Sequence, residues 1–280
     1  MKASNVKRKV RRFAFYTVLL CLTIFTLVPL IWVIITSLKL DAEVLRTPVV
    51  YFPKNVIWDN YRYVWEKAQF SKFFFNTVLV SGITTAIVVV LSMLVAYGLS
   101  RFKFRGKKGI MNLLLLTQLL PGMMLLVPIF ITLNNLRLVN TLTGLIIVFV
   151  AFDLPFCSLL LRNFANNIPV SLEEAAMIDG CSTLGVLFRI VFPLLLPGAI
   201  AVGVFSFLGS WNEFLFPLVL MSDPAKFTIS IGLGYMKGAY ATKYAAMAAG
   251  TVISLVIPLA LFAIMQKHLI NGLTSGSVKE

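Results

Sequence analysis

Two acidic residues, Asp153 and Glu213, lie inside long apolar runs of this chain, where a charge is costly and usually functional. Glu213 follows Trp211 and Asn212 and precedes Phe214. A carboxylate and an amide that can bond hydroxyl groups therefore adjoin aromatic rings that can cover an apolar surface, which is the combination that sugars favour. Residues 211–214 are a candidate substrate-binding segment, with an interhelical hydrogen bond or a gate as the alternative. For Asp153 we expect a helix–helix bond or a hinge.

The composition indicates a membrane protein. Hydrophobic residues make up 59% of the 280 positions and charged residues only 13%, about half the charged fraction of a soluble domain. Six apolar runs reach the roughly 20 residues that a transmembrane helix needs, which predicts an all-α polytopic fold. Prolines and glycines interrupt these runs, and we expect plain kinks there, with broken helices that line a pathway as the alternative. The expected spans are about 13–36, 74–99, 110–132, 143–162, 197–221 and 246–267.

The placement of charge predicts the orientation. The net charge is +14, and the head 1–12 and the connection 101–108 are basic without any acid. Basic segments beside apolar runs mark cytoplasmic loops, and the same clustering argues against nucleic-acid binding. Counting spans from these segments places both termini, the polar loop 163–196 and the tail 268–280 inside, and the loop 222–244 outside.

Several chemistries find no support in the sequence. His268 is the sole histidine, and Cys21, Cys157 and Cys181 follow no spacing of a disulfide framework or metal site. The glycine-rich loop with Lys and Ser or Thr that holds phosphates is missing. We therefore expect no enzyme, no metal and no cofactor bound by this chain. If ATP drives it, a separate subunit must supply the ATPase.

The polar loop predicts a helical hairpin. Ser171 and Glu174 have the spacing of a capping box, and Gly180 is well placed to end the helix that they begin. Ser182 can cap a second short helix that leads to Phe192 and back to the membrane. The hairpin either grips a partner or is a capped surface helix without one, and the residues alone leave both open.

The spacing of this loop resembles a known family. Glu174-Ala175-Ala176, Gly180, Ile190 and Phe192-Pro193 are similar to the EAA loop of binding-protein-dependent ABC transporter permeases, although the family pattern ends in Leu-Pro. The resemblance extends over nearly the whole chain, from the basic head 1–12 through 13–280 as one transmembrane domain, and points to the smaller permease subunit of maltose-type carbohydrate importers. It implies that the loop forms a coupling helix that docks on a cytoplasmic ATPase. The implied coupling residues are Glu173, Glu174, Ala175, Ala176, Asp179, Gly180, Ile190 and Pro193.

The same resemblance implies further contacts. The tail would reach the ATPase dimer through Asn271, Gly272, Leu273, Thr274, Ser275 and Gly276. The outer loop would face a solute-binding protein through Lys226, Gly234, Tyr235, Lys237 and Gly238. The implied partners are a homologous second permease, two copies of an ATPase that holds ATP and Mg²⁺, an extracytoplasmic binding protein, a sugar and membrane lipid. The implied location is the cytoplasmic membrane of a bacterium or archaeon.

Two other functions compete with an importer subunit. A self-contained secondary transporter or channel for a small polar solute would need an internal repeat and ion-coupling carboxylates at mid-membrane. No convincing repeat is visible, and Asp153 and Glu213 are the only such carboxylates. A membrane scaffold without transport activity would need neither Glu213 nor so specific a loop.

Overall fold

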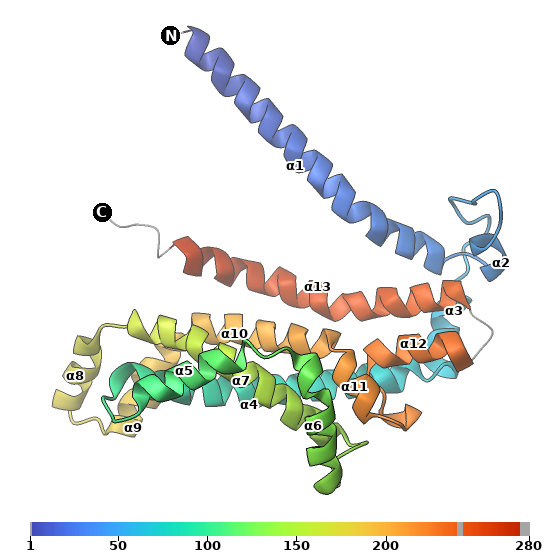
Figure 1. Cartoon of the computed structure of the whole chain (residues 1–280). Helices are drawn as coiled ribbons and strands as arrows, with labels where there is room; N and C mark the ends of the chain where they lie inside the picture. Colours follow the sequence, from blue (N-terminus) through green and yellow to red (C-terminus); the bar gives the residue numbers. More distant parts are fainter. Residues whose placement is uncertain (1, 240–242, 275–280) are drawn as a thin grey trace. The chain divides into compact units, whose positions relative to one another are not determined.

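The computed structural model describes residues 2–239 and 243–274, and every regular element in these ranges is a helix (Figure 1). The chain divides into two compact units. The smaller unit comprises Met1–Phe70 and Tyr235–Leu255, and the larger comprises Ser71–Gly234 and Val256–Glu280.

The membrane fold expected from the apolar runs is confirmed. Five helices in the described residues are long and apolar enough to cross a membrane, and a bent pair of helices makes a sixth span if it is counted as one. The five are built on α1 (Lys2–Ser37), α4 (Phe70–Arg101), α7 (Leu142–Asn166), α10 (Phe192–Asn212) and α13 (Tyr244–Thr274). The bent pair is α5 (Lys107–Thr117) and α6 (Gly122–Asn135).

The smaller unit is held together by polar contacts around the end of α1. The Asn60 amide donates to the carbonyl oxygens of Ser37 and Lys39, both at 2.9 Å. Asp41 accepts a 2.8 Å hydrogen bond from the backbone N–H of Ala245, in the first turn of α13. In contrast, no residue in the most apolar stretch of α1 is buried. Short helices α2 (Asp41–Val44) and α3 (Asp59–Arg62) and a π-helical turn (Tyr63–Lys67) complete this part.

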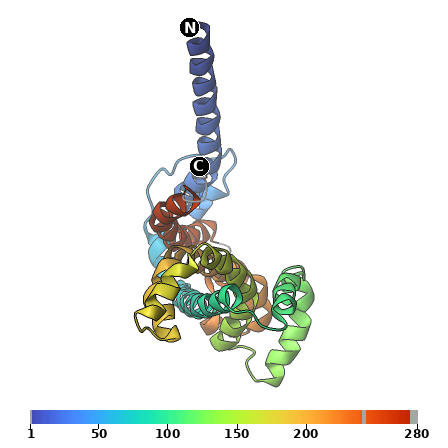
Figure 2. The same ribbon diagram turned by 90° about the vertical axis from the view of Figure 1, so that its left-hand side faces the viewer.

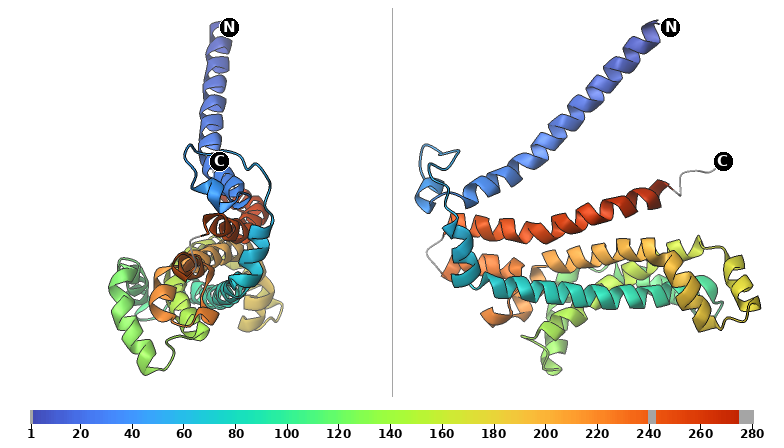
Figure 3. Two further views of the ribbon diagram at one scale, coloured as in Figure 1. Left: turned by 90° about the vertical axis from the view of Figure 1, so that its right-hand side faces the viewer. Right: turned by 180° about the vertical axis from the view of Figure 1, so that it is seen from behind.

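The core of the larger unit lies where α4, α7 and α10 run side by side (Figures 1 and 3). Ala96 of α4, Leu161 of α7 and Leu195 of α10 have no exposed surface. Gly198 allows α10 to approach α7 closely, because a Cβ atom there would lie 2.7 Å from the ring of Phe164. This close packing gives the loops at both ends a rigid support.

Two spans are broken, and at Pro121-Gly122 the expectation of a plain kink is wrong. The axes of α5 and α6 differ by 102°, with Pro121 in extended conformation at the break. Proline lacks the N–H that would continue the helix. The expected span 197–221 is also interrupted, because Glu213 is extended between α10 and the short helix α11 (Leu215–Leu220). Five other prolines of the described residues remain inside helices: Pro29, Pro128, Pro155, Pro197 and Pro258.

Two regions expected as loops are largely helical. Residues 222–244 contain a 3₁₀ turn (Pro224–Lys226) and the helix α12 (Ile229–Ala239). The Asn76 amide donates to the carbonyl oxygens of Ala225 and Phe227 at 2.9 and 3.0 Å, which fixes the entry to α12. At the other end of the chain, α13 continues to Thr274, beyond the expected end at 267.

Candidate functional site

The predicted hairpin lies at one end of the larger unit, which Figure 2 views end-on. It consists of α8 (Val170–Ile178), α9 (Thr183–Val186) and a π-helical turn (Leu187–Val191) that continues into α10. The expected capping box is wrong: Pro169 is the N-cap residue, and no side chain caps α8. Since Pro169 already has a φ of −60° that suits a helix start, α8 begins one residue before Ser171.

The turn of the hairpin follows the sequence pattern. Gly180 has a φ of +88°, the left-handed conformation in which glycine carries no steric penalty. Its N–H donates to Met177 O at 3.1 Å, and the N–H of Cys181 donates to Ala176 O at 2.9 Å, which closes the end of α8. Ser182 Oγ accepts a 3.2 Å bond from the N–H of Gly185 and caps α9 as predicted.

A buried ion pair ties the hairpin to α4. Glu173 is 3% exposed, and its Oε1 atom lies 2.5 Å from Nε of Arg101, the last residue of α4. Tyr97 OH donates to the other carboxylate oxygen at 3.3 Å, and Arg101 Nη2 donates to Ile168 O at 2.9 Å. Sequence reasoning missed Arg101 and Tyr97, because Arg101 was interpreted only as an orientation charge.

The outer side of the hairpin is open. Of the remaining predicted coupling residues, Ala176 is buried, Ile190 is half-buried, and Glu174, Ala175, Asp179, Gly180 and Pro193 are exposed. Exposed apolar side chains accompany them, although the sequence analysis did not single them out. Their exposed fractions are 46% for Met177, 86% for Ile178, 66% for Leu184 and 58% for Phe188. Exposed apolar surface of this kind commonly contacts a protein partner.

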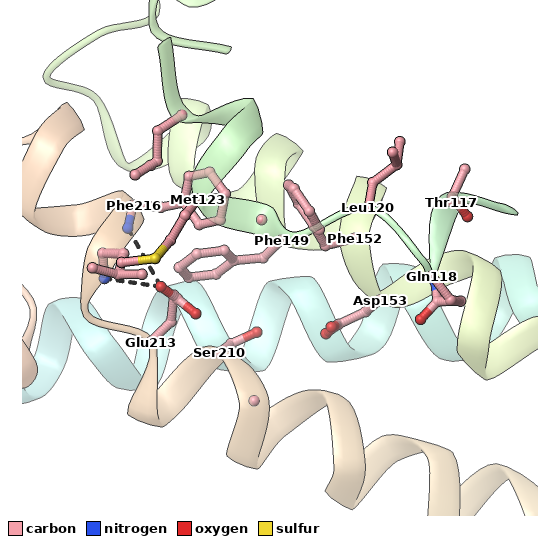
Figure 4. Close-up of a pocket in the computed structure, with 14 residues that line it drawn as sticks. Thr117, Gln118, Leu120, Met123, Phe149, Phe152, Asp153, Ser210, Glu213 and Phe216 are labelled. Carbon is pink, nitrogen blue, oxygen red and sulfur yellow. Dashed lines mark hydrogen bonds between the residues drawn. The ribbon is translucent and has the colours of Figure 1, made fainter. Parts of the chain in front are cut away.

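A pocket of about 340 Å³ lies between the two broken spans (Figure 4). The α5–α6 break contributes Thr117 and Gln118, α7 contributes Phe152 and Asp153, and the end of α10 contributes Ser210. Glu213 and Phe216 line it from the second break. The rings of Phe152 and Phe216 are 5.0 Å apart between centroids.

The two carboxylates of this pocket also hold the structure. Glu213 Oε1 accepts hydrogen bonds from the N–H groups of Leu215 and Phe216 at 2.9 and 3.4 Å, and thereby caps the start of α11. Asp153 Oδ2 accepts a 2.6 Å bond from Ser206 Oγ of α10. The helix–helix bond expected for Asp153 is therefore present, and this residue lines the pocket as well.

The candidate segment 211–214 divides in the structure, and only Glu213 lines the pocket. Trp211 is buried, with its ring centroid 5.8 Å from that of Phe74 and 5.6 Å from that of Phe207. Asn212 is exposed and donates to Leu208 O, and Phe214 is 43% exposed. Trp211 and Asn212 end α10 and point to different faces of that helix, whereas Glu213 and Phe214 lie in the break before α11.

None of the residues implied as partner contacts that the structure describes belongs to the pocket lining. Lys226 Nζ donates to Asn140 O at 3.0 Å, while Gly234 and Tyr235 are exposed on α12, whose last turn includes the backbone of Lys237 and Gly238. The backbone of residues 271–274 forms the end of α13, and Ser275 and Gly276 lie outside the described residues. Within the described ranges no group of three His, Cys, Asp or Glu could hold a metal ion.

The packed spans and the exposed helical hairpin define a helical membrane protein. The chain belongs to the family described as the inner membrane component of binding-protein-dependent transport systems, whose pattern matches residues 89–274. The matched region of this chain includes the α4–α5 connection, the hairpin and the pocket.

Relatives agree with this assignment, and a solved structure has a similar fold. The sulfoquinovosyl glycerol transport system permease protein SmoH of Agrobacterium fabrum is 36% identical over 90% of this chain and 89% of its own length. The diacetylchitobiose uptake system permease protein NgcG of Streptomyces coelicolor is 33% identical over 96% of this chain and 90% of its own length. The fold is similar to a chain of a bacterial ABC transporter that imports the acidic polysaccharide alginate, with a TM-score of 0.81, 22% identity and coverage of 92% and 96%.

Proposed function

We propose that the chain is one permease subunit of an ATP-driven, binding-protein-dependent importer of oligosaccharides and forms half of the translocation pathway. The names of SmoH and NgcG assign carbohydrate-containing substrates to two relatives. The pocket in this chain combines carboxylates and a serine hydroxyl with phenylalanine rings. These groups can bond the hydroxyl groups of a sugar and cover its apolar face.

The hairpin faces the cytoplasm in this proposal. Arg101, which binds Glu173, is the first residue of the basic segment 101–108. Basic segments beside membrane spans stay on the cytoplasmic side. Because the 2.5 Å ion pair fixes the hairpin to that segment, the hairpin lies on the same side. Counting the spans from there puts both termini in the cytoplasm and α12 on the outer side.

The Glu173–Arg101 ion pair is the observation that carries the coupling role. A docking helix transmits force only if it is fixed to a span, and this pair joins α8 to the end of α4. The exposed residues of the hairpin, among which Ile178 is the most exposed large apolar side chain, then dock on a separate ATPase. Two ATPase copies hold ATP and Mg²⁺, a second permease completes the pathway, and a binding protein delivers the sugar near Lys226 and Tyr235. ATP-driven closure of the ATPase subunits shifts the spans between two conformations. ATP and the sugar-loaded binding protein can drive this shift because they bind the two conformations with different affinities.

The docking role can be tested at Ile178. Ile178→Asp changes a side chain that is 86% exposed, so the fold should persist. We expect membrane levels to stay normal while co-purification of the ATPase and ATP-dependent sugar uptake fall at least about tenfold. Leu45→Asp, at a 66% exposed position of the smaller unit, serves as the matched control. Full uptake by Ile178→Asp would contradict the coupling role, and uptake without any ATPase would favour a self-contained transporter.

A further inference from the structure

The pocket between the broken spans carries charge of one sign only. Asp153 and Glu213 both line it, and none of its lining residues is Lys, Arg or His. In the view of Figure 4 the two carboxylates and Ser210 follow one side of the pocket, with Phe149 and Phe152 opposite. A ligand in this space therefore meets acceptor groups on one side and rings on the other.

Each carboxylate keeps one oxygen for the pocket. Asp153 Oδ2 is engaged by Ser206, and Glu213 Oε1 by two backbone N–H groups. Their second oxygens, Oδ1 and Oε2, have no hydrogen-bond partner within the described part of the chain. Since an ionised carboxylate only accepts hydrogen bonds, these two atoms call for donors such as the hydroxyl groups of a ligand.

Ser210 is an independent sign of a ligand. It is 5% exposed and lines the pocket, and its Oγ atom has no hydrogen-bond partner among the described residues. Buried polar atoms in native proteins are nearly always satisfied, and an exception requires an explanation such as a missing ligand. A hydroxyl group of a ligand can both donate to and accept from this serine.

The charge balance opposes an anionic ligand. The N-terminus of α6 reaches the pocket at Gly122, and a helix N-terminus carries about half a positive charge. The N-terminus of α11 is already occupied by Glu213 Oε1. Two carboxylates thus outweigh one half-charge. The volume of about 340 Å³ is near the lower end of the usual range for small-molecule sites, about 300–1,000 Å³.

We propose that this pocket is a subsite for an uncharged sugar ring and that Asp153 and Glu213 exclude sugars bearing carboxylate groups. The proposal rests on the sugar-importer function and adds a substrate class to it. The family does not fix this class, because one solved structure with the same fold comes from an importer of an acidic polysaccharide.

The charge selection is tested with the complete transporter in lipid nanodiscs. Equilibrium binding is measured for maltotriose, arabinotriose and diacetylchitobiose as uncharged probes, and for trigalacturonate as the charged probe. We expect at least one uncharged probe to bind at least tenfold more tightly than trigalacturonate, since repulsion by one nearby charge at intermediate dielectric constant is worth about tenfold. Asp153→Asn and Glu213→Gln keep the shape of the side chain and one acceptor oxygen. Each should reduce the preference for the uncharged probe over trigalacturonate about tenfold.

The ligand role of Ser210 is tested by separating binding from stability. Ser210→Ala removes a hydroxyl without a protein partner, so the Tm should stay the same or rise while affinity for the uncharged probe falls at least threefold. Ser81→Ala is the matched control, because Ser81 Oγ is also buried without a partner but lies outside the pocket lining. Its Tm should likewise stay the same or rise, but its affinity for the uncharged probe should not change.

Three results would overturn the subsite. They are equal binding of charged and uncharged probes by the wild type, binding of no uncharged probe, and unchanged affinity in Ser210→Ala. The proposed importer function is judged separately by ATP-dependent uptake of any sugar presented by the binding protein. Such uptake would persist if only the pocket assignment were wrong.

Discussion

Arg101 joins three parts of the larger unit through one side chain. It ends α4, binds the Glu173 carboxylate of α8, and donates to Ile168 O in the turn between α7 and α8. The side chains of the pair are only 11% and 4% exposed, so water cannot replace either partner. A buried charge that loses its partner destabilises a protein far more than an exposed one does.

Glu173→Gln should therefore lower the free energy of unfolding by about 3 kcal/mol, because the guanidinium of Arg101 stays buried without a counter-charge. Thermal unfolding and limited proteolysis of the hairpin in the purified complex measure this loss. Glu66→Gln is the control: it removes the exposed Arg62–Glu66 pair, 74% and 55% exposed, and should cost about 0.5 kcal/mol or less. If both variants lost a similar free energy of unfolding, the buried pair would contribute no more to stability than the exposed pair does.

Gly180→Asp should uncouple ATP hydrolysis from uptake. The position has a φ of +88°, where an L side chain costs about 1–2 kcal/mol, and a negative charge at the end of α8 is opposed by the helix dipole. Space is not the obstacle, since no atom lies within 4 Å of a Cβ built there. Uptake and co-purification of the ATPase are the measurements. Gly180→Asn has the same size without charge and tolerates this conformation better, so it should retain most of the uptake.

At the scale of elements, the segment after α1 is organised around a buried amine. Lys39 is 2% exposed, its Nζ atom donates to Val50 O at 2.6 Å, and it lies 4.4 Å from the centre of the Trp32 ring. Burial lowers the pKa of Lys39, and the nearby Glu43 carboxylate opposes that shift. The amine thus fixes residues 38–50 against the end of α1, at the cost of a partly dehydrated charge.

The pKa of Lys39 predicts a pH dependence. Because its folded-state pKa lies below the ordinary 10.5, the unfolded chain binds more protons in this range, and stability from this group rises as pH increases towards 10.5. The Tm measured between pH 8 and pH 10 should therefore include a rising contribution that is missing in Lys39→Met. An identical pH profile for the variant would contradict this account. Lys54→Met, at an exposed position, controls for general charge effects.

The sequence predicted those elements whose signals are local. Apolar runs predicted the spans, Gly180 predicted the end of α8, and Ser182 predicted the cap of α9. The break at Glu213 was missed because it depends on where a side chain points: Glu213 Oε1 replaces the backbone partners of α11. The start of α8 was placed wrongly because Pro169 outweighs the capping potential of Ser171.

For the whole molecule, the pocket could be predicted only in part. Glu213 and Asp153 are visible as charges in apolar runs, and both line the pocket. Gln118 and Ser210 do not stand out in the sequence, because uncharged polar residues are also common at positions inside a helix bundle that bind no ligand. Both residues line the same pocket because the axes of α5 and α6 differ by 102° at the break near Pro121 and because α10 ends at Asn212. Long-range assembly of this kind is beyond local sequence patterns.

The bare surface of α1 has a consequence for how the protein is made. This helix precedes α7 in the chain, and nothing in its most apolar stretch is buried within the described residues, whereas half of the corresponding stretch of α7 is buried. During translation α1 can thus leave the insertion machinery and enter lipid alone, while α7 must wait for α4 and α10. Fused to a reporter, residues 1–45 should insert as efficiently as within the full chain, and a glycosylation-site mapping assay would show it. Poor insertion of this fragment would mean that α1 depends on later helices for its entry.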